Sequence, residues 1–193
     1  VDAIYNQNTG IISTFNYNSN TGNDTLYGNN GDDTILGDRG DDIIFGGDGD
    51  DILIGSDGVD EIYGGNGNDQ IVGGVDSDSS FTDSDNNKIY GEDGDDIIWG
   101  ANGEDIIYGG DGNDTIYGNK GDDIIYDGKG KDIVYAGEGN DIIYLEGQNQ
   151  LTTFGGSIDT AFLGEAGNDI FVINKDLTAS AGSGILNDII FDF

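Results

Sequence analysis

The chain has 193 residues, of which 39 are acidic and six are basic, so its formal net charge at pH 7 is -33; this charge excludes nucleic acid as a partner. It contains no Cys, His, Pro or Met, which excludes disulfides, thiolate or imidazole metal sites and His-dependent catalysis. No apolar stretch is long enough to cross a membrane and no basic segment precedes one, so neither a transmembrane segment nor a cleavable signal peptide is expected.

Residues 1–18 are predicted to form a capping hairpin. Ile4-Tyr5 and the segment 11–15 are short and apolar, and Asn8-Thr9-Gly10 between them is typical of a turn. A cap is expected because the repeats that follow would otherwise expose an open sheet edge. Val1 is not an initiator methionine, so we expect the chain to be a fragment or a processed product.

Residues 19–144 form fourteen nine-residue units in unbroken register. Each approximates Gly-Gly-x-Gly-x-Asp-x-apolar-x, most clearly in residues 46–54 and 109–117. Position six is Asp in thirteen of the fourteen units, position four is Gly in twelve, and position eight is Leu, Ile or Val in thirteen. This regularity argues against a disordered acidic chain and indicates a solenoid in which each unit contacts only its neighbours.

Within each unit, six residues are predicted to turn and three to extend. Gly at positions one, two and four suits a tight loop, and the residues at positions seven to nine favour a strand. Because side chains alternate along a strand, position eight should face the core. Two units then make one coil, with one strand in each of two parallel sheets. The predicted core consists of Leu26, Ile35, Ile44, Leu53, Ile62, Ile71, Ile89, Ile98, Ile107, Ile116, Ile125, Val134 and Ile143.

Residues 73–90 depart from the pattern. They keep the eighteen-residue count, but two glycines are replaced by Asp, Asn87 replaces the recurrent Asp, and Ser80 replaces the core residue. A degenerate coil, bulged or partly disordered, is predicted here. The segment 83–87 also resembles the start of an EF-hand loop, which leaves a separate calcium loop as the alternative.

The register breaks after Tyr144. Residues 145–163 are predicted to be an irregular loop or edge cover. Residues 164–193 should contain one further unit, at 164–172, and a closing strand at 188–193.

The position-six aspartates point to metal chemistry. Stacking places the carboxylates of units two apart about 4.8 Å from each other, so that one cation fits between them. Calcium accepts six to eight oxygen ligands with loose geometry, and Gly-rich loops expose the backbone carbonyls that such a site needs. A solvated Asx turn explains one Asp-Gly loop but not thirteen aspartates in phase. Position-five acids are expected to face water.

The array resembles the RTX (repeats-in-toxin) proteins over residues 19–144 and again at 164–172. The resemblance implies an all-β, right-handed parallel β-roll, with calcium between consecutive turns on each side. It also implies that the position-six Asp and loop carbonyls are the ligands. The matching metal positions are Asp24, Asp33, Asp42, Asp51, Asp60, Asp69, Asp78, Asp96, Asp105, Asp114, Asp123, Asp132, Asp141 and Asp169.

Two ladders of aspartates are expected. The first runs through Asp24, Asp42, Asp60, Asp78, Asp96, Asp114 and Asp132; the second runs through Asp33, Asp51, Asp69, Asp105, Asp123 and Asp141 and is interrupted at Asn87. About eight or more calcium ions are expected on the adjacent pairs outside residues 73–90. These pairs are 24 with 42, 42 with 60, 96 with 114, 114 with 132, 33 with 51, 51 with 69, 105 with 123, and 123 with 141.

Two functions are compatible with the sequence. The first is a structural, self-assembling protein of a surface layer, fibre or adhesin; the second is the C-terminal secretion and folding module of a larger exported enzyme or toxin. Because RTX proteins typically leave the cell unfolded by type I secretion and fold outside on calcium, the resemblance implies a secreted or cell-surface bacterial protein. An enzyme is not expected, since no Ser-, Cys- or His-centred constellation is present and no cleft is implied for a carboxylate pair.

Self-association is expected through the outer faces. Position nine is aromatic in eleven of fourteen units, without a break from Tyr90 to Tyr144, and position seven beside it is often Ile. Both positions should point outward. The alternative is that these residues reflect strand propensity and stacking between coils alone. Ice binding is disfavoured because position seven varies irregularly among Thr, Ile, Glu, Gln and Lys.

Overall fold

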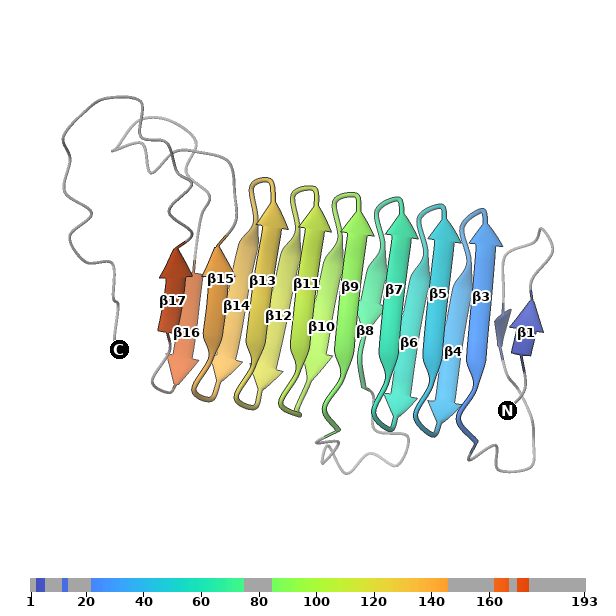
Figure 1. Ribbon diagram of the computed structural model, residues 1–193, viewed down its shortest axis with the longest axis horizontal. Coiled ribbons are helices and arrows are strands. Elements are labelled where there is room, and N and C mark those ends of the chain that lie inside the picture. The colour runs from blue at the N-terminus through green and yellow to red at the C-terminus, as the bar shows by residue number, and fades with distance from the viewer. Residues whose placement is uncertain are drawn as a thin grey trace.

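A computed structural model of the chain describes residues 3–5, 12–13, 22–74, 85–145, 162–166 and 170–173, with side chains in 22–74 and 85–145. These residues form strands stacked in two layers (Figure 1). The strands are β1 (Ala3–Tyr5), β2 (Ile12–Ser13), β3 (Thr25–Asn30), β4 (Thr34–Arg39), β5 (Ile43–Asp48), β6 (Ile52–Asp57), β7 (Glu61–Asn66), β8 (Gln70–Val72), β9 (Lys88–Asp93), β10 (Ile97–Ala101), β11 (Ile106–Asp111), β12 (Thr115–Lys120), β13 (Ile124–Lys129), β14 (Ile133–Glu138), β15 (Ile142–Leu145), β16 (Phe162–Ala166) and β17 (Ile170–Ile173).

Consecutive strands lie in opposite sheets, which confirms the predicted two-sheet solenoid. The odd-numbered strands form a nine-stranded sheet and the even-numbered strands an eight-stranded sheet, and every pairing is parallel. Within residues 22–74, paired residues are eighteen apart, as in Leu26 with Ile44 and Ile35 with Leu53. One coil is therefore two units. No helix that could span a membrane occurs in the part of the chain that the structure describes.

Most strands are six residues long, whereas three were predicted. They begin at position seven and continue through position three of the next unit, so that Gly47 pairs with both Asn29 and Gly65. The chain reverses mainly at positions four to six. At position four Gly49 has φ +139°, and a Cβ there would collide with the backbone of Gly31 in the preceding coil. Glycine is thus required both by the turn and by the close stacking of coils.

The core is a single file of aliphatic side chains between the sheets. All thirteen predicted position-eight residues are buried, at 0 or 1% exposure. Positions seven and nine of the same strands are partly or fully exposed, as alternation along a strand requires. With one apolar residue per unit facing inward, the core is narrow, and the sheets need further stabilisation at the loops.

The degenerate coil predicted at 73–90 lies partly outside the described residues, and the strands on either side of it do not keep the eighteen-residue offset. β7 pairs directly with β9 (Ile62 with Ile89) and β8 pairs directly with β10 (Ile71 with Ile98), so the offset between coils rises here from 18 to 27 residues. One of the two units therefore adds no strand to either sheet. The physical reason is that Ser80 cannot supply a core side chain, whereas Ile89 can. Residues 75–84, which include the first two residues of the EF-hand-like segment 83–87, lie outside the described residues.

The two ends also differ from the predictions. β1 and β2 are not a hairpin: they belong to different sheets and pair in parallel with β3 and β4. They extend the stack and are themselves the edge strands of their sheets at this end. Near the other end, β16 begins within the predicted irregular segment and pairs with β14, and β17 places residues 170–172 of the last unit on β15. The predicted closing strand at 188–193 lies outside the described residues.

Candidate metal centre

The position-six aspartates connect neighbouring coils. The backbone N–H of one aspartate donates to Oδ1 of the aspartate in the next coil, at 2.7 Å from Asp24 to Asp42 and at 2.9 Å from Asp96 to Asp114. The same residue's carbonyl accepts the N–H of position seven in the next coil, as in Ile43 to Asp24 (2.9 Å). Position six is therefore fixed on both sides, and its carboxylates stack along the loops.

Two such ladders run along opposite edges of the roll. All eight neighbouring pairs that were expected lie in adjacent coils and are joined by this hydrogen bond. The predicted membership of the ladders is wrong beyond residue 69, because the single missing strand exchanges the two edges. The first ladder is Asp24, Asp42, Asp60, Asn87, Asp105, Asp123 and Asp141, and the second is Asp33, Asp51, Asp69, Asp96, Asp114 and Asp132.

Where position one is a described glycine, the ladder carboxylate of the same unit faces a small cradle beside it. A Cβ placed on Gly46 would meet Oδ2 of Asp51 and the carbonyl oxygen of Gly64 in the next coil. The same arrangement recurs at Gly37, with Asp42 and Gly55. Position one is thus glycine because a carboxylate oxygen and a carbonyl oxygen converge there, and not because of its backbone angles.

The Oδ2 atoms of these aspartates are buried and have no hydrogen-bond donor. This holds for Asp42, Asp51, Asp69, Asp96, Asp114 and Asp123, whose side chains are at most 1% exposed. An ionised oxygen in this position is costly without a compensating positive charge. The cradle therefore has the acceptors of a cation site and lacks a protein cation to satisfy them.

Burial raises the pKa of the same six carboxyls. The pKa reaches about 8 for Asp96 and Asp123 and about 6 for Asp51 and Asp69. Loss of hydration is the main cause; the backbone N–H of the preceding coil acts in the opposite direction, and the charged neighbours that contribute are all acidic. A divalent cation would reverse this balance, because it favours the ionised form.

The donor set fits calcium. Nowhere in the described residues do three acidic side chains gather as a metal-binding cluster, so carbonyl oxygens must complete any site. A ligand set of carboxylate and carbonyl oxygens suits a hard cation with flexible coordination. Asp78 and Asp169, two of the expected ligands, lie outside the described residues.

Position five forms a second, outer ladder that the sequence analysis missed. Position five faces water as expected, and it also bonds between coils: Oδ1 of Asp32 accepts the N–H of Asp50 in the next coil (3.0 Å), and Oδ1 of Asp50 accepts that of Asn68 (2.9 Å). These side chains are nevertheless exposed. The recurrence of both Asp and Asn at position five could have indicated this ladder. The two residues share an acceptor oxygen but not a negative charge, so the shared feature points to a hydrogen bond.

Asp127 is a further buried acid that the repeat pattern did not indicate. It stands at position one, where most units have Gly, and its side chain is 3% exposed. Its carbonyl oxygen lies at the cradle of Gly109 and Asp114. The backbone of position one therefore keeps its place even when the residue is not glycine.

Comparison with known families gives one match. The RTX calcium-binding nonapeptide repeat matches in four copies, over residues 18–53, 45–80, 81–116 and 108–143. A comparison with curated proteins returned no match.

Proposed function

The chain belongs to the RTX calcium-binding nonapeptide repeat family, and on that premise we propose that the two aspartate ladders bind calcium and that the bound ions make folding possible. The observation that carries this proposal is the row of buried Oδ2 atoms, each beside a position-one carbonyl of the next coil. Calcium would supply the positive charge at these cradles. The aspartates hold the coils in register through Oδ1, and Oδ2 is left for the ion.

The energetic scale supports a link between binding and folding. A site at ten times its dissociation constant stabilises the folded state by about 1.4 kcal/mol. Eight sites would contribute on the order of 11 kcal/mol, which is comparable with the net stability of a whole domain. Since the core is only one side chain wide, the proposed ions are a major part of the folding free energy.

Equilibrium dialysis at millimolar calcium tests the proposal. We expect at least eight ions per chain, given the eight adjacent Asp pairs, with the pair of Asp69 and Asp96 across the insertion as a further candidate. Two ions or fewer per chain would contradict the assignment of the ladders. The midpoint of calcium-induced folding should lie at about 0.1–1 mM, the range of extracellular calcium modules. A midpoint below about 1 µM would argue against folding outside the cell.

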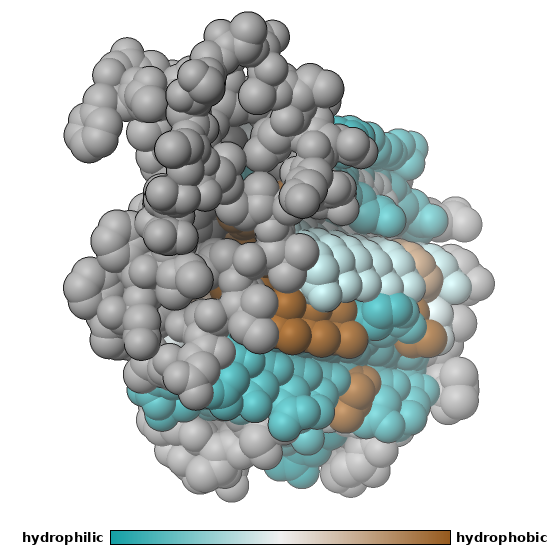
Figure 2. Space-filling model, turned by 60° about the vertical axis from the view of Figure 1, so that its left-hand side comes forward, coloured by the Kyte–Doolittle hydropathy of each residue, from teal (hydrophilic) through white to brown (hydrophobic). Residues whose placement is uncertain are grey.

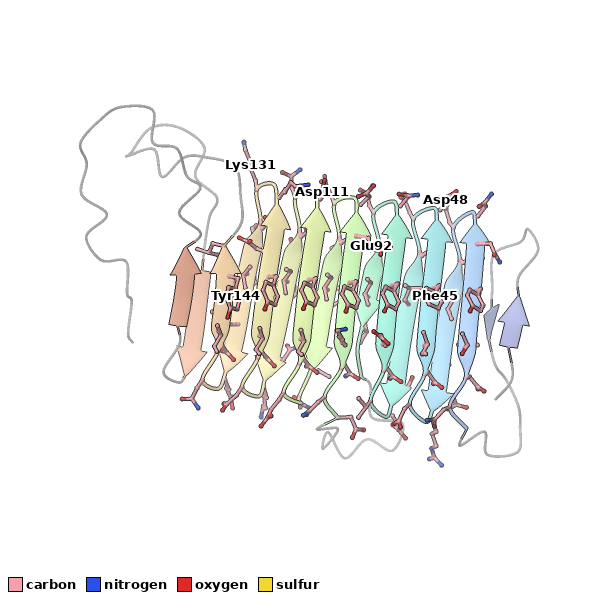
Figure 3. All side chains as sticks on the ribbon, viewed as in Figure 1. Phe45, Asp48, Glu92, Asp111, Lys131 and Tyr144 are labelled. Atoms are coloured by element: carbon pink, nitrogen blue, oxygen red, sulfur yellow. The ribbon has the colours of Figure 1, made fainter. Side chains whose placement is uncertain are left out.

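The proposed role is structural rather than catalytic, and the outer face of the nine-stranded sheet supports it. Seven position-nine rings lie across this sheet in an unbroken stack from Tyr27 to Tyr144, with centroids 4.4–5.0 Å apart (Figure 3). An apolar patch lies beside the ring row (Figure 2); position seven there is Ile106, Ile124 and Ile142.

The strip of this face that positions seven and nine form carries no net charge, whereas acidic residues such as Asp48, Glu92 and Asp111 lie toward the ends of its strands (Figure 3). Its only charged residues at positions seven and nine are Glu61 and Lys88, which pair with each other at 3.5 Å. Two copies could therefore approach through this strip with less of the repulsion that the net charge of -33 creates elsewhere. We assign to it the self-association of calcium-loaded chains in a surface layer, fibre or adhesin.

Sedimentation velocity at saturating calcium tests the assembly role. Wild type should form concentration-dependent assemblies, and a chain with Tyr108, Tyr126 and Tyr144 all replaced by Lys should not. The matched control replaces the same three by Phe, which Phe45 shows to be compatible with the stack. A wild-type chain that stays monomeric at high protein concentration would instead favour the secretion and folding module of an exported enzyme or toxin.

A further inference from the structure

Asn87 occupies a position in the first ladder that is otherwise filled by Asp. It is 2% exposed, its Oδ1 accepts the N–H of Asp60 (2.9 Å), and its own N–H donates to Oδ1 of Asp105 (2.7 Å). The coil-to-coil hydrogen bonds of the ladder are therefore complete at this residue. Asn87 differs from the ladder aspartates in the second polar atom of its side chain, which is Nδ2 instead of Oδ2.

The amide nitrogen of Asn87 takes the place of the carboxylate Oδ2. In the cradle of Gly73, the atoms that a Cβ would meet are the carbonyl oxygen of Gly100 and Nδ2 of Asn87. Nδ2 donates to this same carbonyl at 3.4 Å and to the carbonyl of Asp85 at 3.4 Å. The orientation of the amide is fixed by its partners, since Oδ1 faces an N–H and Nδ2 faces two carbonyls.

The cradle at Asn87 is therefore closed without an ion. A donor from the side chain satisfies the carbonyl that faces an unpaired carboxylate oxygen in the cradles of Asp51, Asp96 and Asp123, and no negative charge is buried. Replacing the charged acceptor by a neutral donor removes both reasons for binding a cation.

The place of Asn87 in the fold explains what replacing Asp by Asn achieves there. Asn87 lies directly before β9, in the connection from β8, where the offset between paired strands is 27 residues instead of 18. A longer loop costs more entropy to close. The Nδ2 contact, which forms without an ion, ties the residue before β9 to Gly100 in β10 at the place where the register of the roll is hardest to set.

We propose that Asn87 is a calcium-independent joint in the roll, which links the arrays on either side of the insertion before the ions bind. This inference rests on the proposed calcium binding and concerns the one ladder position from which the ion is excluded. It makes Asn87 a determinant of both the number of ions and the calcium concentration needed for folding.

Asn87→Asp tests the joint, with Asn86→Asp as the matched control. Both variants add one negative charge, but Asn86 is an exposed position-five residue whose Oδ1 accepts the N–H of Glu104 (2.9 Å), outside the cradle. We expect N87D to bind at least one more calcium ion than wild type in equilibrium dialysis and to need more calcium to reach half-folding. N86D should match wild type in both respects.

The outcomes separate the two proposals. If neither wild type nor N87D binds calcium, the proposed function fails. If wild type binds calcium and N87D has the same stoichiometry and folding midpoint, the function stands and the joint is refuted. Should N87D not fold at saturating calcium, the reverse exchange Asp123→Asn decides: it should lose at least one ion and still fold, and an unchanged number of ions would overturn the inference.

Discussion

Replacing Asp123 by Asn should have opposite effects on stability with and without calcium. Oδ1 of Asp123 accepts the N–H of Asp105 (2.9 Å), and Oδ2 faces the carbonyl of Ala136 across the cradle of Gly118. An asparagine keeps the Oδ1 acceptor and offers a donor to the carbonyl, as Asn87 does naturally. The substitution therefore removes a buried charge and a cation ligand while the hydrogen bond between coils is kept.

The size of each effect follows from the cradle. Burial raises the pKa of Asp123 from 3.8 to about 8, so without calcium at pH 7.5 this carboxyl takes up a proton on folding, which costs up to about 5 kcal/mol. Asp123→Asn removes that cost and should stabilise the metal-free fold. With calcium at ten times the dissociation constant, each lost site costs about 1.4 kcal/mol. The loaded roll should then be less stable by about that amount, or by twice as much if both neighbouring sites depend on Asp123.

Two titrations at pH 7.5 measure the two effects. In excess chelator, folding is driven by trimethylamine N-oxide, and the midpoint should fall for D123N. In calcium, unfolding is driven by urea, and the midpoint should also fall, which now means a loss of stability. Asp122→Asn is the control, because it removes the same charge from an exposed position-five side chain that accepts the N–H of Asn140. If D123N destabilises the protein in both media, the cradle does not carry the electrostatic cost assigned to it.

Three further predictions concern pH, the core and the backbone. Without calcium, the carboxyls whose pKa is raised to between about 6 and about 8 hold protons in the folded state that the unfolded chain has released. Metal-free stability should therefore fall from pH 4 to pH 8, and circular dichroism in chelator should show more β-structure at pH 5 than at pH 8; an equal signal would contradict these shifts. Ile107→Ala should lower stability in calcium by about 2–5 kcal/mol, measured by urea unfolding, and a loss below about 0.5 kcal/mol would mean that the core is not close-packed. Ala101 has φ +130°, so Ala101→Gly should stabilise the roll by about 1 kcal/mol and raise its melting temperature; a lower melting temperature would show that φ is not strained.

The repeated part of the fold could be predicted because the residues of one unit determine its core position, its turn and its contact with the next coil. Ile at position eight specifies the core, Gly at position four the turn, and Asp at position six the coil-to-coil contact. The nine-residue period then fixes which residues become neighbours. The failure at residues 73–90 has the same origin: period counting assumes that every unit adds a strand, and Ser80 shows that a unit without a core side chain need not.

The cradle could be predicted only in part. Sequence spacing brought Asp42 next to Asp60, but it could not show that Oδ1 is used by a backbone N–H while Oδ2 is not. The role of Asn87 could not be predicted for the same reason. Asparagine at a ladder position suggests a lost metal site until the two hydrogen-bond acceptors of its Nδ2 are known. These details depend on which atom of a side chain faces which neighbour, and residue types alone do not specify that.

The central claim, that calcium and folding are coupled, is tested most directly by far-UV circular dichroism of the intact chain during a calcium titration followed by excess chelator. The account predicts little ordered β-structure at pH 7.5 without calcium, a cooperative gain of β-signal as calcium is added, and its loss on chelation. A full β-signal that persists in excess chelator would contradict the claim, because the buried carboxylates would then be tolerated without ions.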